Sequence, residues 1–90
     1  PIISVAISAV IDQKGECKHL RVAYGGVAPT PLRIKEVEEF LVGRTLNERN
    51  IKEASSMVLK NVKPAGPATE FKIVKARVML EDALMAIKEE

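Results

Sequence analysis

Cys17 and His19, the one cysteine and the one histidine of the chain, are the residues best suited to chemistry. They stand two positions apart in a stretch with strand-like alternation, so both side chains are expected on the same face. A thiol beside an imidazole can act in nucleophilic catalysis, but no Asn or Asp stands where it would orient the imidazole, and a hairpin makes a poor pocket. Two ligands also fall short of the three or four that zinc requires. We therefore predict no catalytic residue and no metal site, and interpret the pair as structural or surface residues.

The Gly25-Gly26 pair is a second candidate, because glycines can bring backbone amides close to a phosphate. A phosphate loop needs a longer glycine pattern followed by Lys and Ser or Thr, and a dinucleotide fold needs G-x-G-x-x-G before a helix. Pro29 and Pro31 follow instead. We interpret the pair as a bend at a strand end, packed closely against another backbone.

The bulk composition excludes several classes of function. A net charge of +2, interleaved acidic and basic residues and 3% aromatic residues argue against a nucleic-acid partner. A single cysteine excludes an internal disulfide and a cysteine-ligated iron–sulfur cluster, and it fits a cytoplasmic location. The longest apolar stretch is far shorter than the roughly 20 residues that span a bilayer, so no membrane partner is expected.

The first third of the chain predicts strands. Residues 2–11 alternate between a bulky and a small face, and the bulky face holds Ile3, Val5, Ile7, Ala9 and Ile11. The polar residues 12–16 are typical of a hairpin loop. Residues 17–24 alternate again and predict the antiparallel partner, with Leu20, Val22 and Tyr24 on one face. Residues 31–34 could form a short third strand or an edge segment.

Three helices are expected in the remainder. Residues 35–42 form a short helix with Gly43 as its C-terminal cap. The second begins at Thr45 or Asn47, since Thr45 with Glu48 matches a capping box, and it ends at Pro64. Its narrow apolar stripe comprises Ile51, Ala54, Ser55, Val58 and Val62, widened by Leu59.

The third helix is expected at about residues 69–88, after a turn-rich break at residues 63–67. It is apolar on more than one face, so it is either central in the fold or buried against a partner.

The acidic residues Glu36, Glu38 and Glu39 fall in the first short helix. Acidic residues in a first turn offset the helix dipole, so we interpret them as a solvated face and not as an acid–base pair.

Grouped strands followed by grouped helices predict an α+β fold, a small antiparallel sheet of two to three strands covered by three helices. The length suits one domain over residues 1–90. Composition and spacing alone indicate an interaction or structural module.

Residues 21–33 carry a resemblance to a known family. A strand ends in Gly25-Gly26 and is followed by Ala28-Pro29 and by Arg33, which leads into a helix with an acidic residue, Glu36 or Glu38. This order resembles the C-terminal domain of the FAD-binding (medium) subunit of molybdenum hydroxylases, the carbon monoxide dehydrogenase and xanthine dehydrogenase family, which includes aldehyde oxidases. Residues 3–6, 41–46 and 69–72 resemble other segments of that domain, in the same order along essentially the whole chain.

The resemblance implies an accessory docking domain of a molybdenum-containing oxidoreductase. In that family the subunit binds FAD between an N-terminal and a middle domain and passes on electrons that come from molybdenum through iron–sulfur clusters. The expected partners are the flavin-binding domains of the same subunit and the iron–sulfur and molybdenum subunits. We expect no FAD bound to this domain alone, no catalysis by it alone, and no flavin contact that can be assigned to a residue.

The resemblance also implies a candidate interface at two segments, comprising Tyr24, Gly25, Gly26, Pro29, Arg33, Glu70, Phe71 and Lys72. Phe71 stands where the family more often has Tyr, and Lys72 where it more often has Arg. Lysine cannot make the bidentate pairs of arginine, which weakens an ion-pair role at that position. The alternative hypothesis is a stand-alone homo-oligomeric scaffold or interaction domain with no redox role.

Overall fold

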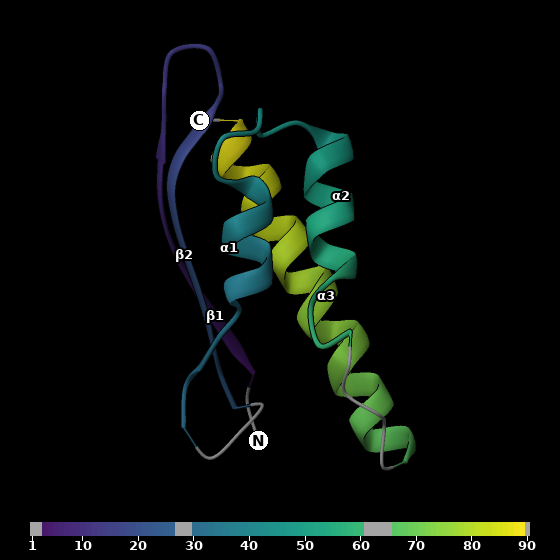
Figure 1. Ribbon diagram of the computed structural model, residues 1–90. Coiled ribbons are helices and arrows are strands. Elements are labelled where there is room, and N and C mark those ends of the chain that lie inside the picture. The colour runs from purple at the N-terminus through teal and green to yellow at the C-terminus, as the bar shows by residue number, and fades with distance from the viewer. Residues whose placement is uncertain (1–2, 27–29, 61–65, 90) are drawn as a thin grey trace.

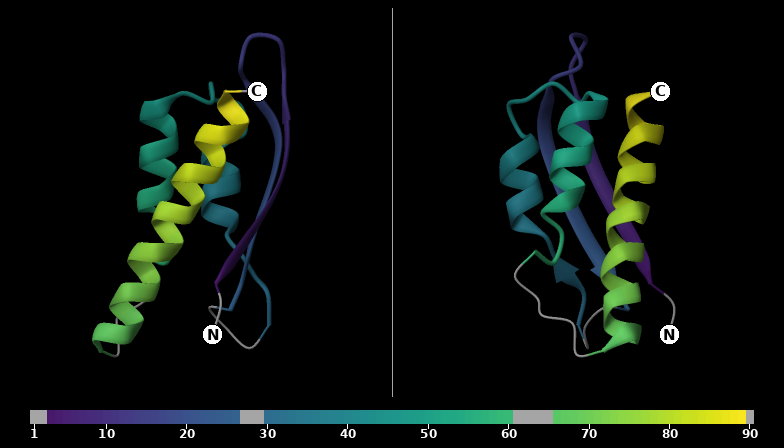
Figure 2. Two further views of the ribbon diagram at one scale, coloured as in Figure 1. Left: turned by 180° about the vertical axis from the view of Figure 1, so that it is seen from behind. Right: turned by 90° about the vertical axis from the view of Figure 1, so that its right-hand side faces the viewer.

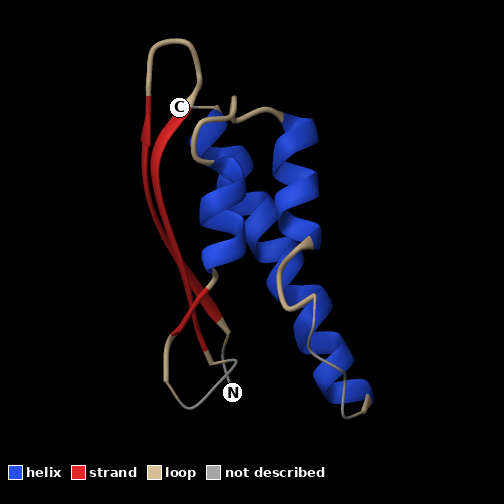
Figure 3. Cartoon of the chain, viewed as in Figure 1, coloured by secondary structure: helices blue, strands red, loops and turns tan. Residues whose placement is uncertain are grey.

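The computed structural model describes residues 3–26, 30–60 and 66–89, with residues 67–69 described by their backbone alone. The elements are β1 (Ser4–Ile11), β2 (Cys17–Gly25), β3 (Leu32–Arg33), α1 (Lys35–Leu41), α2 (Glu48–Ser56) and α3 (Pro67–Lys88). All three helices lie on one face of the sheet (Figures 1 and 3). The predicted α+β class, with a small antiparallel sheet and three helices, is confirmed.

The sheet has the strand order β1-β2-β3, and both pairings are antiparallel. The β1–β2 hairpin turns at Asp12, whose carboxylate accepts the amides of Lys14 and Glu16, both at 2.9 Å. The third strand is short, because its pairing with β2 involves only the two residues of β3. β2 is thus the central strand, paired with β1 from Cys17 to Gly25 apart from Lys18, and with β3 only at one end.

A β-bulge in β2 overturns one prediction. Val10 pairs with His19 and Ile11 with Cys17, so Lys18 has no partner in β1. The inserted residue breaks the period of two, so Cys17 turns into the core while His19 remains exposed. The prediction that the thiol and the imidazole share one face is therefore wrong.

The core lies between the sheet and the helices and is almost entirely aliphatic. As predicted, β2 contributes Leu20, Val22 and Tyr24, each at most 3% exposed. The odd-numbered side chains of β1 face the same core, but Val5, Ile7, Ala9 and Ile11 are only half-buried. The edge strand is therefore less completely covered than the central one.

α2 begins at the second of the two expected positions, after Asn47, and ends earlier than expected. Asn47 is its N-cap, with the side-chain oxygen accepting the Asn50 amide at 2.8 Å, whereas Thr45 forms a β-bridge with Glu16. The helix ends at Ser56, and Leu59 adopts a left-handed φ of 56° that no α-helix can contain. The capping box at Thr45 and the extension to residue 64 were wrong, although Val62 and Pro64 lie outside the described residues.

α3 begins at Pro67, two residues before the expected start, because proline suits the first helical position. One face is buried, at Ile73, Ala76, Leu80 and Leu84. Phe71, Val74 and Val78 remain exposed on another face, at 66, 55 and 52%. The first turns of α3 extend away from the sheet and past the end of α2 (Figures 1 and 2). No described helix is long and apolar enough to cross a membrane.

One buried hydrogen bond joins the sheet to α3. The Tyr24 hydroxyl donates to the Ala76 carbonyl at 2.6 Å, and burial raises the pKa of this phenol. The ring is 1% exposed and is the one aromatic side chain that is fully buried among the described residues.

We expect Tyr24→Phe to lower the free energy of unfolding by about 1 kcal/mol. The ring still fills its site, and the Ala76 carbonyl keeps the bond that the helix itself supplies, so the loss is one net hydrogen bond. Urea unfolding monitored by circular dichroism measures the change. A stability equal to that of the wild type would show that the bond contributes nothing.

We expect Ser55→Ala to stabilise the protein by about 1 kcal/mol, since Ala favours a helix over Ser and no buried hydroxyl is left unpaired. Ser55 is 4% exposed, and its hydroxyl has no hydrogen-bond partner in the described part of the chain. Ser56→Ala is the matched control, because that hydroxyl is exposed and donates to the Glu53 carbonyl at 2.6 Å. If thermal unfolding shows Ser55→Ala less stable than this control, the hydroxyl has a favourable role.

Candidate functional site

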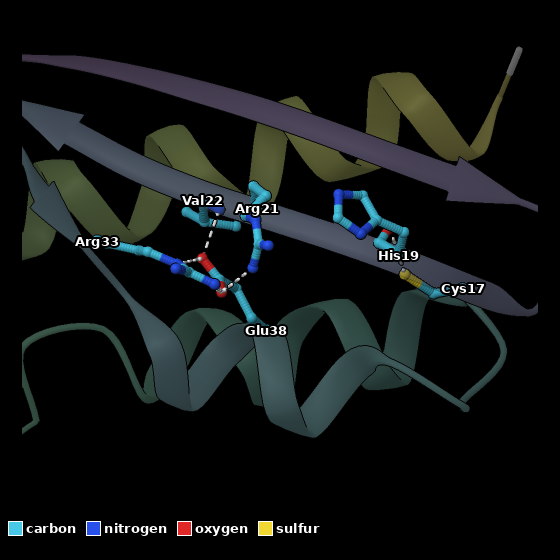
Figure 4. Close-up of polar contacts among 6 residues, drawn as sticks. All are labelled: Cys17, His19, Arg21, Val22, Arg33 and Glu38. Carbon is cyan, nitrogen blue, oxygen red and sulfur yellow. Dashed lines mark hydrogen bonds and ion pairs between the residues drawn. The ribbon is translucent and has the colours of Figure 1, made fainter.

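The most organised polar group in the molecule is the carboxylate of Glu38 on α1. Glu38 is 5% exposed, although it is charged. Arg33 donates to it from Nε at 2.9 Å and from Nη2 at 2.7 Å, and the Val22 amide donates to Oε2 at 2.9 Å. Figure 4 shows Arg33 and Arg21 converging on this carboxylate, with Arg21 Nη1 at 3.9 Å from Oε1. Residues from β2, β3 and α1 therefore meet at one charge.

The surroundings of Glu38 favour its ionised form. The Arg33 guanidinium lowers the pKa of the Glu38 carboxyl, and the Val22 amide and Arg21 act in the same direction. Burial opposes them, since it disfavours a charge, but the net pKa stays below the ordinary value. A carboxylate with a low pKa and both oxygens engaged is a poor general base.

Glu38 has a structural task at the second edge of β2. The Val22 amide donates to Glu38, and the Val22 carbonyl accepts the Ile34 amide at 3.0 Å. Farther along β2, the Cys17 amide donates to the Arg44 carbonyl at 2.9 Å. These bonds replace the strand pairing that the short β3 does not supply, and they hold α1 along the edge of β2.

A shallow concavity of about 540 Å³ lies beside this cluster. Its polar lining comprises Lys18, His19, Arg21, Arg33, Lys35, Glu38 and Glu39. Lys18 is already paired with Glu16 at 2.6 Å, and Arg33 with Glu38. The concavity is a mixed-charge surface, and no Ser, Thr or Cys is among the described residues that line it.

Cys17 and His19 do not form a catalytic pair in this arrangement. Cys17 is completely buried, and burial raises the pKa of its thiol, which disfavours the reactive thiolate. Its sulfur contacts the backbone carbonyl of His19 at 3.5 Å and not the imidazole (Figure 4). No group of three or more His, Cys, Asp or Glu residues within the described chain could hold a metal ion.

The Gly25-Gly26 bend is explained by space and by backbone conformation. A Cβ at Gly25 would lie 2.8 Å from the Ser4 hydroxyl, so the close neighbour is a side chain and not the expected backbone. Gly26 adopts a φ of 84°, which favours glycine. Neither residue opens a helix, so the phosphate-loop geometry is absent here.

The structure places the candidate interface residues in very different environments. Tyr24 is buried in the core, so its side chain cannot form part of a contact surface, and that part of the prediction is wrong. The Arg33 guanidinium is hydrogen-bonded to Glu38, although its side chain is still 43% exposed. Pro29 lies outside the described residues. Glu70 and Phe71 are exposed on the first turns of α3, and Lys72 is half-buried.

Two features were missed from the sequence. Glu38 was interpreted as solvated with Glu36 and Glu39, which are indeed exposed. The spacing of Ile34, Val37, Glu38 and Leu41 would have placed Glu38 on the buried face. Val74 and Val78 extend the exposed face that begins at Phe71 at helical spacing, but the all-round apolar pattern of α3 hid this division.

We expect Glu38→Gln to lower the free energy of unfolding by about 2 kcal/mol at neutral pH, because the Arg33 pair and one amide bond are charge-assisted. The folded pKa of Glu38 lies below the ordinary 4.5, so its contribution is complete above that pH. It disappears as the pH falls through the folded pKa.

Urea unfolding at pH 7 and at pH 3 checks this, with Glu39→Gln as the exposed control that should change stability by less than about 0.5 kcal/mol. The Glu38→Gln deficit should shrink at the lower pH. An equal deficit at both values would contradict the role of the charge.

Comparisons with known proteins give the family. Residues 1–87 match the model of the CO dehydrogenase flavoprotein C-terminal domain. The chain is 35% identical over 60 residues to the glyceraldehyde dehydrogenase medium chain of Sulfolobus acidocaldarius, which covers 66% of this chain and 21% of that protein. It is 36% identical over 66 residues to aldehyde oxidase 1 of Rattus norvegicus, and this match covers 73% of this chain and 5% of that protein. The chain thus spans a small part of these relatives.

Solved structures agree with this assignment. A CO dehydrogenase chain from Oligotropha carboxidovorans superposes with a TM-score of 0.80 at 26% identity, over 97% of this chain and 31% of that one. Quinoline 2-oxidoreductase from Pseudomonas putida 86 shares the fold, with a TM-score of 0.75 at 15% identity. The match covers 99% of this chain and 38% of that one. The resemblance noted in the sequence is confirmed, and the chain belongs to the family of CO dehydrogenase flavoprotein C-terminal domains.

Proposed function

We propose that this domain docks onto the flavin-binding part of a molybdenum-containing oxidoreductase, and so supports electron transfer through FAD without catalysing a reaction alone. The observation that carries this proposal is the exposed apolar face of α3. Phe71, Val74 and Val78 lie at helical spacing and are more than half exposed. A row of large apolar side chains on one helix face is typical of an interaction site.

The location of this face supports docking at one end of the molecule. It begins on the first turns of α3, which extend away from the sheet (Figure 2), and continues to Val78 near the middle of the helix. Only the opposite face of the helix reaches the core, through Ile73, Ala76 and Leu80. A partner could therefore cover the exposed face without disturbing the fold.

The described residues do not fit a complete FAD site. Gly25 is packed against Ser4 and no helix follows the glycine pair directly, so the pyrophosphate would lack a cradle. The Tyr24 ring, which could otherwise stack on a flavin, is buried. We therefore propose that the other domains of the parent subunit hold FAD, and we assign no step of the reaction to this chain.

The family supports the kind of partner. Relatives are named as a dehydrogenase medium chain and an aldehyde oxidase, and each is several times longer than this chain. We propose the flavin-binding domains as the direct partner, within an assembly that also holds iron–sulfur and molybdenum subunits. The substrate of that assembly is decided elsewhere.

We expect Val74→Glu to weaken docking to the flavin-binding polypeptide of the same organism by about tenfold, because the partner would have to bury a charge against its apolar surface. Calorimetric titration with the purified polypeptide measures this. Val42→Glu is the matched control, since Val42 is also an exposed valine, at 43%, and stands at the end of α1.

Equal affinities for the two variants would contradict a docking role for α3. If the wild-type chain associates only with itself and never with the flavin-binding polypeptide, the alternative of a homo-oligomeric scaffold is correct.

A further inference from the structure

β1 is an edge strand whose outer side is unpaired among the described residues. It pairs with β2 alone, and the strand order places it at the margin of the sheet. An edge strand presents amides and carbonyls that can pair with another strand. Eight residues make this a long edge for so small a domain.

The bonds of Val22 show which backbone groups are free. Both its amide and its carbonyl bond away from β1, to Glu38 and to Ile34. Its partner Ile7 therefore belongs to a non-hydrogen-bonded pair, and the Ile7 amide and carbonyl point outward. By the period of two, the same groups of Val5 and Ala9 also point outward.

The edge lacks the features that normally prevent strand addition. Proteins protect such edges with lysine, proline, inward-pointing charges or bulges in the edge strand. Residues 4–11 contain no charged residue and no proline, and the bulge lies in β2. The strand thus retains an unprotected template for pairing.

The side chains along the edge lead to the same conclusion. Val5, Ile7 and Ala9 face the core but stay half-buried, whereas their partners in β2 are at most 3% exposed. One more strand beside β1 would cover their outer flank.

The position of α3 favours a single strand over a second copy of the chain. α3 contacts β1 and crosses it on the helix side of the sheet (Figure 2, right). If a second copy paired antiparallel through the same edge, both helix layers would lie on one side of the joined sheet, and its α3 would crowd against the α3 that covers β1. A lone extended segment carries no such helix.

We propose that the outer edge of β1 accepts an extended strand from the flavin-binding part of the larger polypeptide, and this assignment of source depends on the proposed function. The added strand is uncharged and alternates apolar with small polar residues. The apolar residues of the added strand lie beside Val5, Ile7 and Ala9. The amides and carbonyls of those added residues bond to β1. Backbone bonds supply affinity, and alternate side chains supply specificity.

A synthetic peptide, Thr-Val-Thr-Ile-Thr-Val-Thr, tests the edge without any partner protein. We expect it to slow hydrogen exchange at the amides of Val5, Ile7 and Ala9, as measured by NMR. N-methylation of its Val and Ile amides should weaken binding more than about tenfold, because three bonds are lost. N-methylation of alternate Thr amides, which point away, should leave affinity unchanged.

Equal effects of the two methylation patterns, protection confined to α3, or no protection at millimolar peptide would each overturn the proposal. A dimer of the chain alone that protects the same three amides as its concentration rises would overturn the assignment to a single strand.

Ala9→Pro tests the protein side, since proline removes one outward amide and is tolerated at the edge of a sheet. Peptide binding should weaken roughly three- to tenfold. Ala9→Val retains the amide and serves as the control. If the two variants bind the peptide equally, the Ala9 amide takes no part; if proline unfolds the domain, the methylated peptides still decide.

The complex with the flavin-binding polypeptide tests the source of the strand. Protection of the Val5, Ile7 and Ala9 amides on complex formation supports the proposal. A stable complex in which these amides still exchange fast would overturn it while leaving the docking function intact. Absence of a complex would instead count against the docking function, and the peptide result would still decide whether the edge accepts a strand.

Discussion

The fold depends on how the backbone amides and carbonyls on the side of β2 that faces away from β1 find hydrogen-bond partners. β2 is the central strand, yet β3 pairs with it at only two positions, Ala23 and Tyr24. The backbone groups farther along would otherwise be left without strand partners in a partly buried place, which costs free energy. The Glu38 carboxylate, the Ile34 amide and the loop after α1 take over this task. The Glu38 side chain and these backbone bonds together hold α1 beside β2, and α1 in turn covers the core.

The aliphatic core makes this arrangement sensitive to local bonding. A domain of this size buries only about 60 to 65% of its unfolded surface, so its margin of stability is narrow. Single polar contacts therefore matter more than they would in a larger protein. Glu38 anchors α1 and the Tyr24 hydroxyl anchors α3, while the core side chains between them supply non-directional burial. The two bonds orient helices that apolar packing alone would position less specifically.

The sequence predicted the strands and the fold class because their signals are local and periodic. The alternation of β1 and the bend at Gly26 depend on neighbouring residues alone. The bulge at Lys18 was not predictable, since it arises from the pairing of β1 with β2. α2 ends at Ser56, and Leu59 then adopts a left-handed φ of 56° against its own preference, so local propensity does not indicate this end. The charge of Glu38 suggests exposure to solvent, whereas its spacing from Ile34, Val37 and Leu41 places it on the buried face of α1.

The same structural roles bear on why we propose recognition, and no reaction, for this domain. The buried side chains that could take part in chemistry are already engaged: the Cys17 thiol lies in the core, Glu38 is bonded to Arg33, and the Tyr24 hydroxyl is bonded to α3. Releasing any of them for catalysis would remove a contact that holds the fold. The described chain also offers an apolar helix face on α3 and a row of outward backbone groups on β1. Both recognise polypeptide, the first through burial of apolar surface and the second through strand pairing. They belong to different elements, so a partner that used both would fix the orientation of the domain as well as its position.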